Sequence, residues 1–488
     1  MRQARTERRC PHFPNLPARR YDGVSMEASM PQSYDAIVIG AGQSGPFLAA
    51  RLAAAGRKVL QIEREHLGGT CVNNGCIPTK SLVASARVAH MARRAGDFGV
   101  ATGPVTVDMK AVKARKDAIV NDSVTGLTSW LSNMENLTLL WGSAKFTGPH
   151  EIEVLGERYS ADNIFINTGG RPSLPDWPGI DEVRHLDNVS MMDLDVLPEH
   201  LVVVGGSYIG LEFAQMYRRF GSRVTVLEMG PRLVAREDAD VSGAIADILA
   251  AEGIAVEVNV HDLAFRKLSG DRVGVSAIAD GRLIALEGTH LLVATGRKPN
   301  VEDLDVAAAG IKLDARGFIE VDDQLRTSVP GIWAMGDVNG RGAFTHTSYN
   351  DFEIVAANLL DDDPRRTTDR PVAYALYIDP PLGRVGLTEA QVRATGRPAL
   401  IATRPMSRVG RAHERSETQG FMKVLVDAET KLVLGASLLG IEGDEVIHLF
   451  IDNMVAKLPY TAISRTMHIH PTVSELIPTL LQDLKPLV

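Results

Sequence analysis

The most constraining feature of the chain is a strand–turn–helix–strand unit with spaced glycines in its turn, which occurs twice. The first copy runs from the apolar segment 34–39 through Gly40, Gly42 and Gly45 to a second apolar segment that ends at Glu63. In such a unit the first glycine makes a tight turn, the second lets a pyrophosphate approach the backbone, and the third allows close helix–strand packing. The helix N-terminus attracts phosphates, and Glu63 would accept hydrogen bonds from a ribose. This unit therefore predicts a dinucleotide site.

The second copy starts at Gly205 and ends at Glu228, with the third glycine at Gly210 and Ser207 in place of the middle glycine. The spacing from the first glycine to the acid is the same in both copies. Two such units predict an α/β fold with two dinucleotide sites, and electrons that pass from a nicotinamide to a flavin to a dithiol. The alternative is a duplicated unit with only a structural role.

Two cysteines lie five positions apart in a glycine-rich stretch, directly before an expected helix at 80–94. Cys76 falls near the N-terminus of that helix, where unpaired N–H groups and the helix dipole favour a thiolate. A zinc site would need three or four ligands, and only His66 lies nearby. A static disulfide between Cys71 and Cys76 would close so short a loop that it would stabilise little. We interpret the two cysteines as a redox-active pair.

The composition limits the class of protein. A length of 488 residues predicts about three domains. A net charge of −8 argues against a nucleic-acid binder, and no apolar run is long enough to span a bilayer. Residues 1–33 are rich in arginine and proline without an apolar core, which excludes a secretory signal. We expect a disordered N-terminal extension, with a targeting signal as the alternative, and a cytoplasmic protein.

Three further apolar runs end in small residues, as strands do where they meet a ligand. These turns contain Thr168 and Gly169, then Gly296, and then Gly336 and Asp337. Asp337 could bond a hydroxyl of a bound cofactor, whereas a solvated turn aspartate is the alternative.

From about residue 371 the pattern changes to longer alternating stretches. Segments 421–426 and 432–439 read as antiparallel strands, and a helix is expected at 444–457. His470 and Glu475 follow across a proline turn and are expected to form a His–carboxylate pair that sets a general acid/base. A surface histidine beside a helix-capping glutamate is the alternative.

Taken together, these motifs resemble the flavin-dependent pyridine nucleotide–disulfide oxidoreductases, which include dihydrolipoamide dehydrogenase, glutathione reductase and mercuric reductase. The block Gly68–Lys80 is similar to their GGTCxNxGCxPSK motif and contains Gly69 and Thr70, with Thr79 where serine is usual. The similarity extends from Tyr34 to the C-terminus and includes both glycine units, the Gly336-Asp337 turn and an HPTxSE ending.

The resemblance implies roles for individual residues. FAD would bind at the first unit and a reduced nicotinamide at the second. Cys71 would attack the substrate, and Cys76 would be the charge-transfer thiol against the flavin. Lys80 would lie by the flavin, paired with Glu212, and in a homodimer His470 would be lent to the partner's cysteines.

The expected fold is α/β, with two Rossmann-like dinucleotide-binding domains and a C-terminal α+β dimerisation domain. The FAD domain would span 34–173 and be completed by 299–370, the NAD(P) domain would span 174–298, and the dimerisation domain 371–488. No resident metal site is predicted. Glu228 favours NADH over NADPH, because its carboxylate would repel a 2′-phosphate.

The leading functional hypothesis is an NAD(P)H:disulfide oxidoreductase that acts on a small-molecule or protein-bound disulfide or dithiol. A second is reduction of a soft metal ion such as Hg(II), with the two thiols as ligands. The chain lacks a cysteine after Cys76, whereas mercuric reductases typically carry a C-terminal cysteine pair that delivers metal. A third hypothesis is a non-catalytic flavoprotein that serves as a redox sensor or a subunit of a complex.

Overall fold

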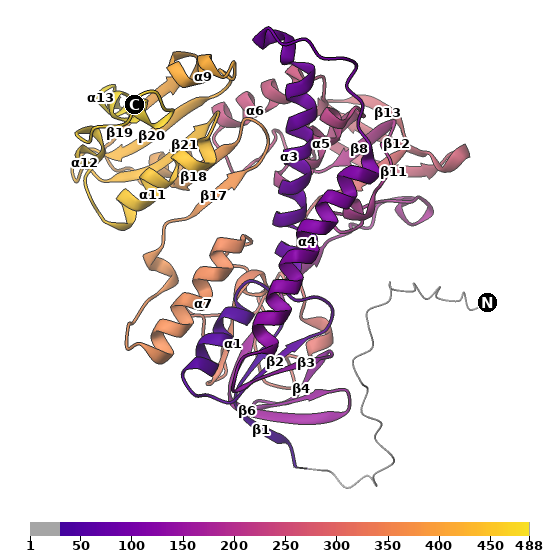
Figure 1. Ribbon diagram of the computed structural model, residues 1–488, viewed down its shortest axis with the longest axis vertical. Helices are drawn as coiled ribbons and strands as arrows, with labels where there is room; N and C mark the ends of the chain where they lie inside the picture. The colour runs from indigo at the N-terminus through magenta and orange to yellow at the C-terminus, as the bar shows by residue number, and fades with distance from the viewer. Residues whose placement is uncertain (1–29, 488) are drawn as a thin grey trace.

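The computed structural model describes residues 30–487, arranged as a lower unit, an upper unit and a C-terminal domain (Figure 1). The expected disordered extension 1–33 lies almost entirely outside the described residues. Its last two positions belong to the first strand, which begins at Gln32. Within residues 30–487, no helix combines the length and the apolar character needed to cross a bilayer.

The lower unit is built on a seven-stranded sheet with the order β3-β2-β1-β6-β5-β4, in which β16 also pairs with β6. Strands β3, β2, β1, β6 and β16 are parallel, whereas β4 and β5 pair antiparallel. All five residues of β2 are buried, as expected for a parallel strand covered on both faces. The strands are β1 (Gln32–Ile39), β2 (Val59–Glu63), β3 (Leu137–Trp141), β4 (Ala144–Gly148), β5 (Glu151–Val154), β6 (Glu157–Ile166) and β16 (Ile332–Ala334).

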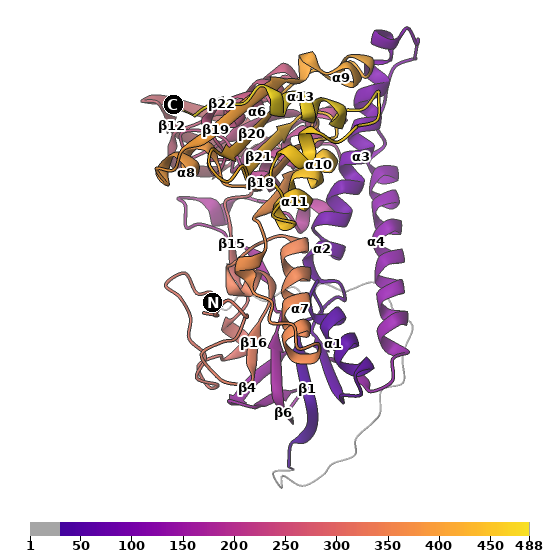
Figure 2. The same cartoon turned by 90° about the vertical axis from the view of Figure 1, so that its left-hand side faces the viewer.

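Helices α1 (Gly45–Ala54) and α7 (Thr345–Leu360) pack together beside this sheet. The short α2 (Gly69–Asn73) leads into α3 (Cys76–Arg93), which runs alongside α4 (Met109–Ser132) in both views (Figures 1 and 2). Helix α3 also contacts the first helix of the upper unit, so it links the two units.

The upper unit repeats the architecture on a smaller scale. Its parallel sheet has the order β10-β9-β8-β14, and a three-stranded antiparallel sheet β11-β12-β13 lies beside it. The elements are β8 (His200–Val204), α5 (Tyr208–Phe220), β9 (Arg223–Leu227), α6 (Ala239–Ala251), β10 (Ala255–Glu257), β11 (Val260–Lys267), β12 (Val273–Ala279), β13 (Arg282–Gly288) and β14 (His290–Val293). Strands β7 (Gly170–Pro172) and β15 (Arg297–Pro299) pair antiparallel where the chain enters and leaves this unit.

The C-terminal domain contains a six-stranded antiparallel sheet with the order β17-β18-β21-β20-β19-β22. Its strands are β17 (Ala373–Leu376), β18 (Leu382–Gly386), β19 (Ala399–Pro405), β20 (Phe421–Asp427), β21 (Val433–Leu439) and β22 (Lys485–Pro486). Its helices are α8 (Glu389–Ala394), α9 (Gly410–Glu414), α10 (Gly443–Val446), α11 (His448–Val455), α12 (Thr461–Ser464) and α13 (Ile477–Gln482). The two antiparallel strands expected at 421–426 and 432–439 are confirmed as β20 and β21.

The single helix expected at 444–457 is wrong, because the structure divides it into α10 and α11 around Ile447. The Ile447 carbonyl accepts from the N–H groups of both Phe450 and Ile451, so the helical ladder tightens at this point. Helix α10 packs on β18 and β21, and α11 packs on β21, so both cover the same sheet, and Ile447 between them keeps helical backbone angles.

An ion cluster around the buried Lys423 joins the C-terminal domain to the upper unit. Lys423 Nζ, on β20, lies 3.0 Å from Asp238, 2.8 Å from Asp240 and 3.4 Å from Glu389. We call these four residues the Lys423 cluster. The Lys423 side chain is only 1% exposed. The carboxylate of Asp238 also accepts the N–H groups of Glu389 and Ala390 at the start of α8, so one upper-unit side chain caps a helix of the other domain.

Candidate active site

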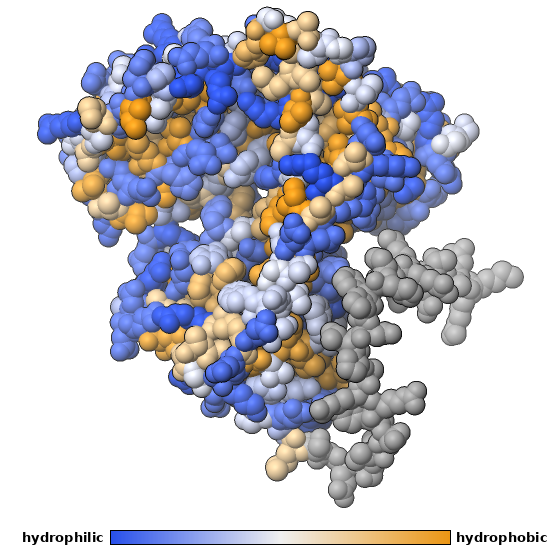
Figure 3. All heavy atoms as spheres, viewed as in Figure 1, coloured by the Kyte–Doolittle hydropathy of each residue, from blue (hydrophilic) through white to orange (hydrophobic). Residues whose placement is uncertain are grey.

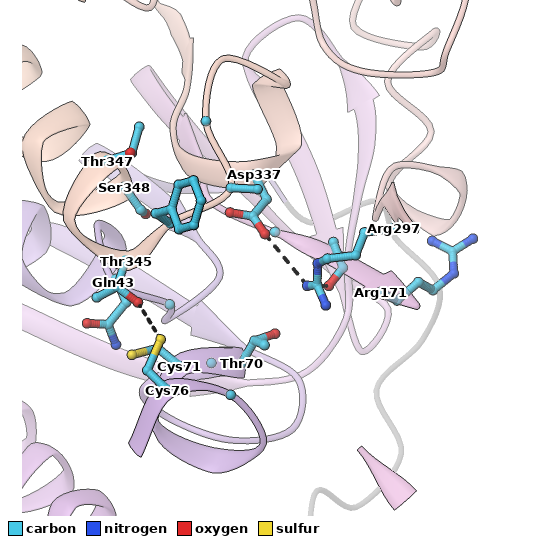
Figure 4. A pocket seen from close by; sticks show the side chains of 18 of the residues that line it. Gln43, Thr70, Cys71, Cys76, Arg171, Arg297, Asp337, Thr345, Thr347 and Ser348 are labelled. Atoms are coloured by element: carbon cyan, nitrogen blue, oxygen red, sulfur yellow. Dashed lines mark hydrogen bonds and ion pairs between the residues drawn. The ribbon is translucent and has the colours of Figure 1, made fainter. Parts of the chain in front are cut away.

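A cavity of about 2210 Å³ lies where the lower unit, the upper unit and the C-terminal domain meet, and Figure 4 shows part of it. Most of the site residues expected from the sequence line this cavity. They are Gly40, Gly42, Glu63, Gly69, Thr70, Cys71, Cys76, Lys80, Thr168, Gly169, Gly205, Glu212, Glu228, Gly296 and Asp337. The structure therefore brings both glycine turns and both cysteines to a single space.

The first glycine turn has no room for side chains. Gly40 has a φ of +96°, and a Cβ there would collide with the Asn167 carbonyl. Gly45 does not line the cavity; a Cβ on it would collide with the Gly40 carbonyl, which is the close helix–strand packing expected of a third glycine. The sequence analysis missed Asn167, whose Oδ1 accepts the Gly45 N–H at 3.0 Å and whose Nδ2 donates to the Met335 carbonyl at 3.1 Å.

The second glycine turn repeats this packing. A Cβ on Gly210 would collide with the Gly205 carbonyl, just as one on Gly45 would with Gly40. Gly210 likewise lies behind the cavity wall, and α5 starts at Tyr208 immediately after Ser207. Both helices therefore direct their N-terminal N–H groups toward the cavity, which suits the phosphates of a dinucleotide.

The acids at the ends of β2 and after β9 are held by the glycine turns themselves. Glu63 Oε2 accepts the Ala41 N–H at 2.7 Å, and Glu228 Oε2 accepts the Gly206 N–H at 2.6 Å. Each carboxylate is thereby fixed beside its turn and keeps further lone pairs for ribose hydroxyls. The residues of the first turn fit a dinucleotide such as FAD, because a bare backbone, a helix N-terminus and an oriented acid meet there.

The cysteine pair lies against the first glycine turn. Cys71 is in α2, and Cys76 is the first residue of α3, which confirms its expected place at a helix N-terminus. Gly69 has a φ of +56°, and its Cβ would lie 2.9 Å from the Gly42 Cα. A Cβ on Gly75 would lie 2.7 Å from the Thr70 carbonyl. These close backbone approaches explain why glycines surround the cysteines.

The two thiols differ in proton affinity. The hydrogen bond that the Cys71 thiol donates to Cys76, together with burial, raises the pKa of Cys71 above its ordinary value. The same bond lowers the pKa of Cys76 from 9.0 to about 6; burial opposes the shift, and Thr345 and Lys80 reinforce it. In the dithiol form the negative charge therefore lies on Cys76 and the proton on Cys71.

Lys80 and Glu212 form the ion pair that the resemblance implied, with 2.8 Å between Lys80 Nζ and Glu212 Oε2. The other carboxylate oxygen of Glu212 accepts the Tyr377 N–H at 3.1 Å, and Lys80 Nζ lies 4.4 Å from the centre of the Tyr377 ring. The pair connects α3, which carries Cys76, to α5 of the upper unit.

Asp337 faces the cavity from the short helix that follows β16, and its carboxylate lies 3.6 Å from the Arg297 guanidinium (Figure 4). Burial raises the pKa of Asp337, although Arg297 opposes this shift. Gly336 does not line the cavity, and its N–H donates to the buried Asp351 at 2.8 Å. The sequence analysis missed Asp351, which also pairs with Arg370 at 2.8 Å.

An aromatic group at the second glycine turn was also missed. The Tyr208 ring meets those of Phe344 and Tyr374 edge-on, and the latter two rings are stacked. The Tyr374 hydroxyl donates to the buried Glu237 at 2.6 Å. These residues come from three separate parts of the chain, so no local pattern indicates their contact.

His470 and Glu475 form the expected pair, with 2.7 Å between Nδ1 and Oε2, but neither lines the cavity of this chain. The His470 side chain is 81% exposed. Two apolar neighbours in the same loop are also exposed, Met467 and Ile469. Figure 3 shows further hydrophobic side chains among hydrophilic ones on the surface of the C-terminal domain. Within residues 30–487, no group of three or more His, Cys, Asp or Glu side chains is arranged to hold a metal ion.

Comparison with known proteins identifies the family. Residues 34–351 match the model of the pyridine nucleotide-disulphide oxidoreductases, and residues 372–481 match their dimerisation domain. The pyridine nucleotide-disulfide oxidoreductase RclA of Escherichia coli is 37% identical over 91% of this chain and 97% of its own. A dihydrolipoyl dehydrogenase of Thermus scotoductus is 34% identical over 91% of this chain and 96% of its own. A mercuric reductase of Streptomyces lividans is 33% identical, with coverages of 91% and 94%.

A solved structure, the HOCl-induced flavoprotein disulfide reductase RclA of Escherichia coli, matches with a TM-score of 0.83 and 36% identity. The match covers 92% of this chain and 99% of that one, and a Cu(II) complex of the same reductase matches similarly, with a TM-score of 0.82. The two glycine turns, the thiol pair and the full-length matches agree. This chain belongs to the pyridine nucleotide-disulfide oxidoreductase family and is an oxidoreductase.

Proposed function

We propose that this protein is an FAD-dependent NAD(P)H:disulfide oxidoreductase similar to dihydrolipoamide dehydrogenase. Electrons would pass from a nicotinamide through FAD to Cys71 and Cys76 and then to a disulfide substrate, or in the reverse direction from a dithiol substrate. The main support is a thiol pair of opposite proton affinities that opens onto the same cavity as two dinucleotide-type turns. We assign residues 34–173 with 299–370 to FAD, 174–298 to the nicotinamide, and 371–488 to dimer contacts.

The residues that would hold FAD are those of the first turn, with Glu63 at the ribose and Asp337 on the opposite wall. Bound FAD would take a hydride from the nicotinamide and deliver two electrons to the Cys71–Cys76 disulfide. The Lys80–Glu212 pair would fix a positive charge beside the start of α3. Thr168 and Gly169 would shape the cavity wall, and Gly336 would support it from behind through its N–H bond to Asp351.

The sulfur chemistry follows from the proton on Cys71. A base removes that proton as Cys71 Sγ attacks one sulfur of the substrate disulfide, and the first substrate thiol leaves with a proton. Cys76, as a thiolate, then attacks Cys71 Sγ and displaces the second substrate sulfur. The thiol–thiolate pair becomes a disulfide, and the substrate disulfide becomes one thiol and one thiolate that takes a proton from solvent, so two electrons are transferred.

His470 is our candidate for that acid and base. Glu475 holds its Nδ1, which leaves Nε2 to take and return a proton. Since His470 is exposed and outside the cavity of its own chain, we assign it to the site of a second subunit. The matched dimerisation domain supports a homodimer, and so do the exposed apolar side chains of Met467 and Ile469.

The nicotinamide preference depends on Glu228. Its carboxylate is anchored by N–H groups of Gly206 and Gly230, both at 2.6 Å, so it cannot easily turn away from a 2′-phosphate. Of the two arginines that follow Glu228 closely in the chain, Arg232 donates to the Ala235 and Glu237 carbonyls, whereas Arg236 lines the cavity and is the cation that could compensate. Because the Glu228 carboxylate is held in place, we propose that NADH is preferred.

Reduction of a soft metal ion is the second candidate. The similarity to mercuric reductases and to a reductase solved as a Cu(II) complex favours it, since paired thiolates suit soft ions. The His470–Glu475 pair distinguishes the candidates, because metal reduction has no leaving thiol to protonate.

The test is the full-length holoenzyme with His470→Ala, assayed by half-reactions. Flavin reduction by NADH should stay nearly unchanged, whereas turnover of a disulfide should fall by about a hundredfold, the scale of a lost general acid. His261→Ala is the matched control, because His261 is also an exposed histidine whose Nδ1 faces a carboxylate, that of Asp262, at 3.0 Å.

The wild-type enzyme is assayed in parallel with lipoamide, glutathione disulfide, Hg(II), Cu(II) and quinones. An unchanged disulfide rate in His470→Ala would refute the role of His470. A wild type that reduces metal ions and none of the disulfides would favour the second candidate. If the protein binds flavin but fails to oxidise NADH in the presence of any of these acceptors, a non-catalytic role would be favoured.

A further inference from the structure

Thr345 is a polar side chain that the proposed reaction has not yet used. It is the first residue of α7, and its hydroxyl oxygen lies 3.2 Å from Cys76 Sγ (Figure 4). A thiolate has no proton to donate, so in the charged form of Cys76 the hydroxyl must be the donor. The Thr345–Cys76 contact is thus a hydrogen bond to the charged sulfur.

We propose that Thr345 is a positioning residue that keeps Cys76 a thiolate while Cys71 is bonded to the substrate. The proposal rests on the proposed function, since it concerns the mixed disulfide of that reaction. By this proposal, a residue of α7, a helix outside the cysteine motif, stabilises the second nucleophile, the Cys76 thiolate.

The charged groups around Cys76 largely offset one another. Lys80, on α3, favours the thiolate, and Glu212, on α5, disfavours it. Because the Lys80 ammonium and the Glu212 carboxylate are paired at 2.8 Å, their electrostatic effects on the Cys76 sulfur oppose each other. The Tyr377 phenol also faces Cys76, from the segment between β17 and β18. Hydrogen bonds from Cys71, on α2, and from Thr345 are therefore the main side-chain support of the thiolate.

Only one of those two donors survives the first chemical step. When Cys71 Sγ bonds to a substrate sulfur, it carries no hydrogen and can no longer donate. Of the two side-chain donors that the structure gives Cys76, Thr345 then remains. Cys76 must still be charged at this stage, because it attacks Cys71 Sγ, forms the Cys71–Cys76 bond and expels the substrate sulfur. That sulfur leaves as a thiolate with the electron pair of the broken bond and takes a proton from solvent.

The experiment reproduces this stage without substrate by using Cys71→Ala, which removes the Cys71 donor and leaves the Cys76 sulfur free. The full-length holoenzyme is alkylated with iodoacetamide across a pH series, and the Cys76 peptide is quantified by mass spectrometry, separately from that of Cys10. The pH midpoint of long-wavelength flavin absorbance gives a second readout of the same thiolate. Thr345→Val, Thr345→Ser and Thr347→Val are each added to Cys71→Ala.

Thr345→Val removes the hydroxyl at nearly constant shape and should raise the Cys76 midpoint by about one to two pH units, the range for a lost hydrogen bond to a charged group. Thr345→Ser keeps the hydroxyl and should restore the midpoint. Thr347→Val makes the same chemical change two residues along α7, where the side chain packs near Gly342, and should leave the midpoint unchanged.

An unchanged midpoint in Thr345→Val would overturn the proposal, and so would an equal shift in Thr347→Val. A rise in Thr345→Val that Thr345→Ser does not reverse would also overturn it, since volume rather than the hydroxyl would then be responsible. An enzyme that reduces no disulfide but shows the expected shifts would refute the proposed function and leave the hydrogen-bond assignment standing.

Discussion

Replacing Lys423 with methionine should destabilise the junction between the upper unit and the C-terminal domain. Met preserves most of the side-chain volume, so the change isolates the ammonium group. In the folded protein that ammonium is 1% exposed and lies within 3.4 Å of three carboxylates. Without it, the buried Asp238 keeps its two backbone donors at the start of α8 but loses the Lys423 ammonium, and three negative groups face one another.

The expected cost follows from burial. Breaking a buried ion pair by removing one partner costs about 3–5 kcal/mol, because the other charge stays buried without compensation. Arg393→Ala is the matched control, since Arg393 also pairs with Glu389, at 2.8 Å, but is 45% exposed. Exposed pairs of this kind contribute about 0.3–0.5 kcal/mol. The two variants should therefore differ by about 3 kcal/mol in the free energy of unfolding.

Urea unfolding at fixed protein concentration, followed by circular dichroism and tryptophan fluorescence, measures this difference. Although burial opposes it, hydrogen bonds from Glu389 and from Lys423 lower the pKa of Asp238. A carboxyl with a lowered pKa in the folded state stabilises above its unfolded pKa, about 3.9, and loses that contribution as the pH falls through the folded value. The effect of Lys423→Met should thus be full at pH 7 and shrink below about pH 4. Equal stabilities of the two variants at pH 7 would refute the reasoning.

Three further predictions concern the active site. Cys71→Ser should retain a long-wavelength flavin absorbance in the oxidised enzyme and Cys76→Ser should lack it; the reverse result would exchange the roles of the two thiols. The Cys76 thiol of the reduced wild type should be alkylated with a midpoint near pH 6, where the hydrogen bond from Cys71 places its pKa; a midpoint near 9 would show that the sulfur is not stabilised. The wild type should have a higher kcat/KM for NADH than for NADPH, and Glu228→Ala should reduce the ratio of these two values. A preference of the wild type of about tenfold for NADPH would contradict the role of Glu228.

Features with a local signal could be predicted from the sequence. The glycine turns can be recognised in the sequence because their geometry excludes side chains at fixed spacings, as the packing of Gly45 on Gly40 shows. Strands β20 and β21 lie within one residue of the segments 421–426 and 432–439 predicted for them, because alternating apolar residues mark a strand locally. The Lys80–Glu212 pair could be anticipated only from the resemblance, since its members lie far apart in sequence.

Contacts between distant segments left no such signal. Asn167 fastens the first turn through its amide, yet in sequence it is one polar residue after a strand. Thr345 and Asp238 likewise carry no signal in the sequence, because their partners come from other segments. Thr345 contacts Cys76, and Asp238 accepts an N–H group at the start of α8. The interruption of the helix at Ile447 has no local signal either, since this residue keeps helical backbone angles and only the hydrogen-bond pattern changes there.

The pairing of β16 with β6 has a consequence for biosynthesis. Ile332 lies beside Ile164, so the sheet of the lower unit is finished only by residues made after the entire upper unit. The upper sheet, by contrast, uses one uninterrupted stretch from β8 to β14. Since domains generally fold as units during synthesis, the later-made upper unit can be complete first. The earlier-made lower unit must wait until the ribosome has released β16, because β5 covers only residues 157–160 on that side of β6 and residues 164–166 stay unpaired there.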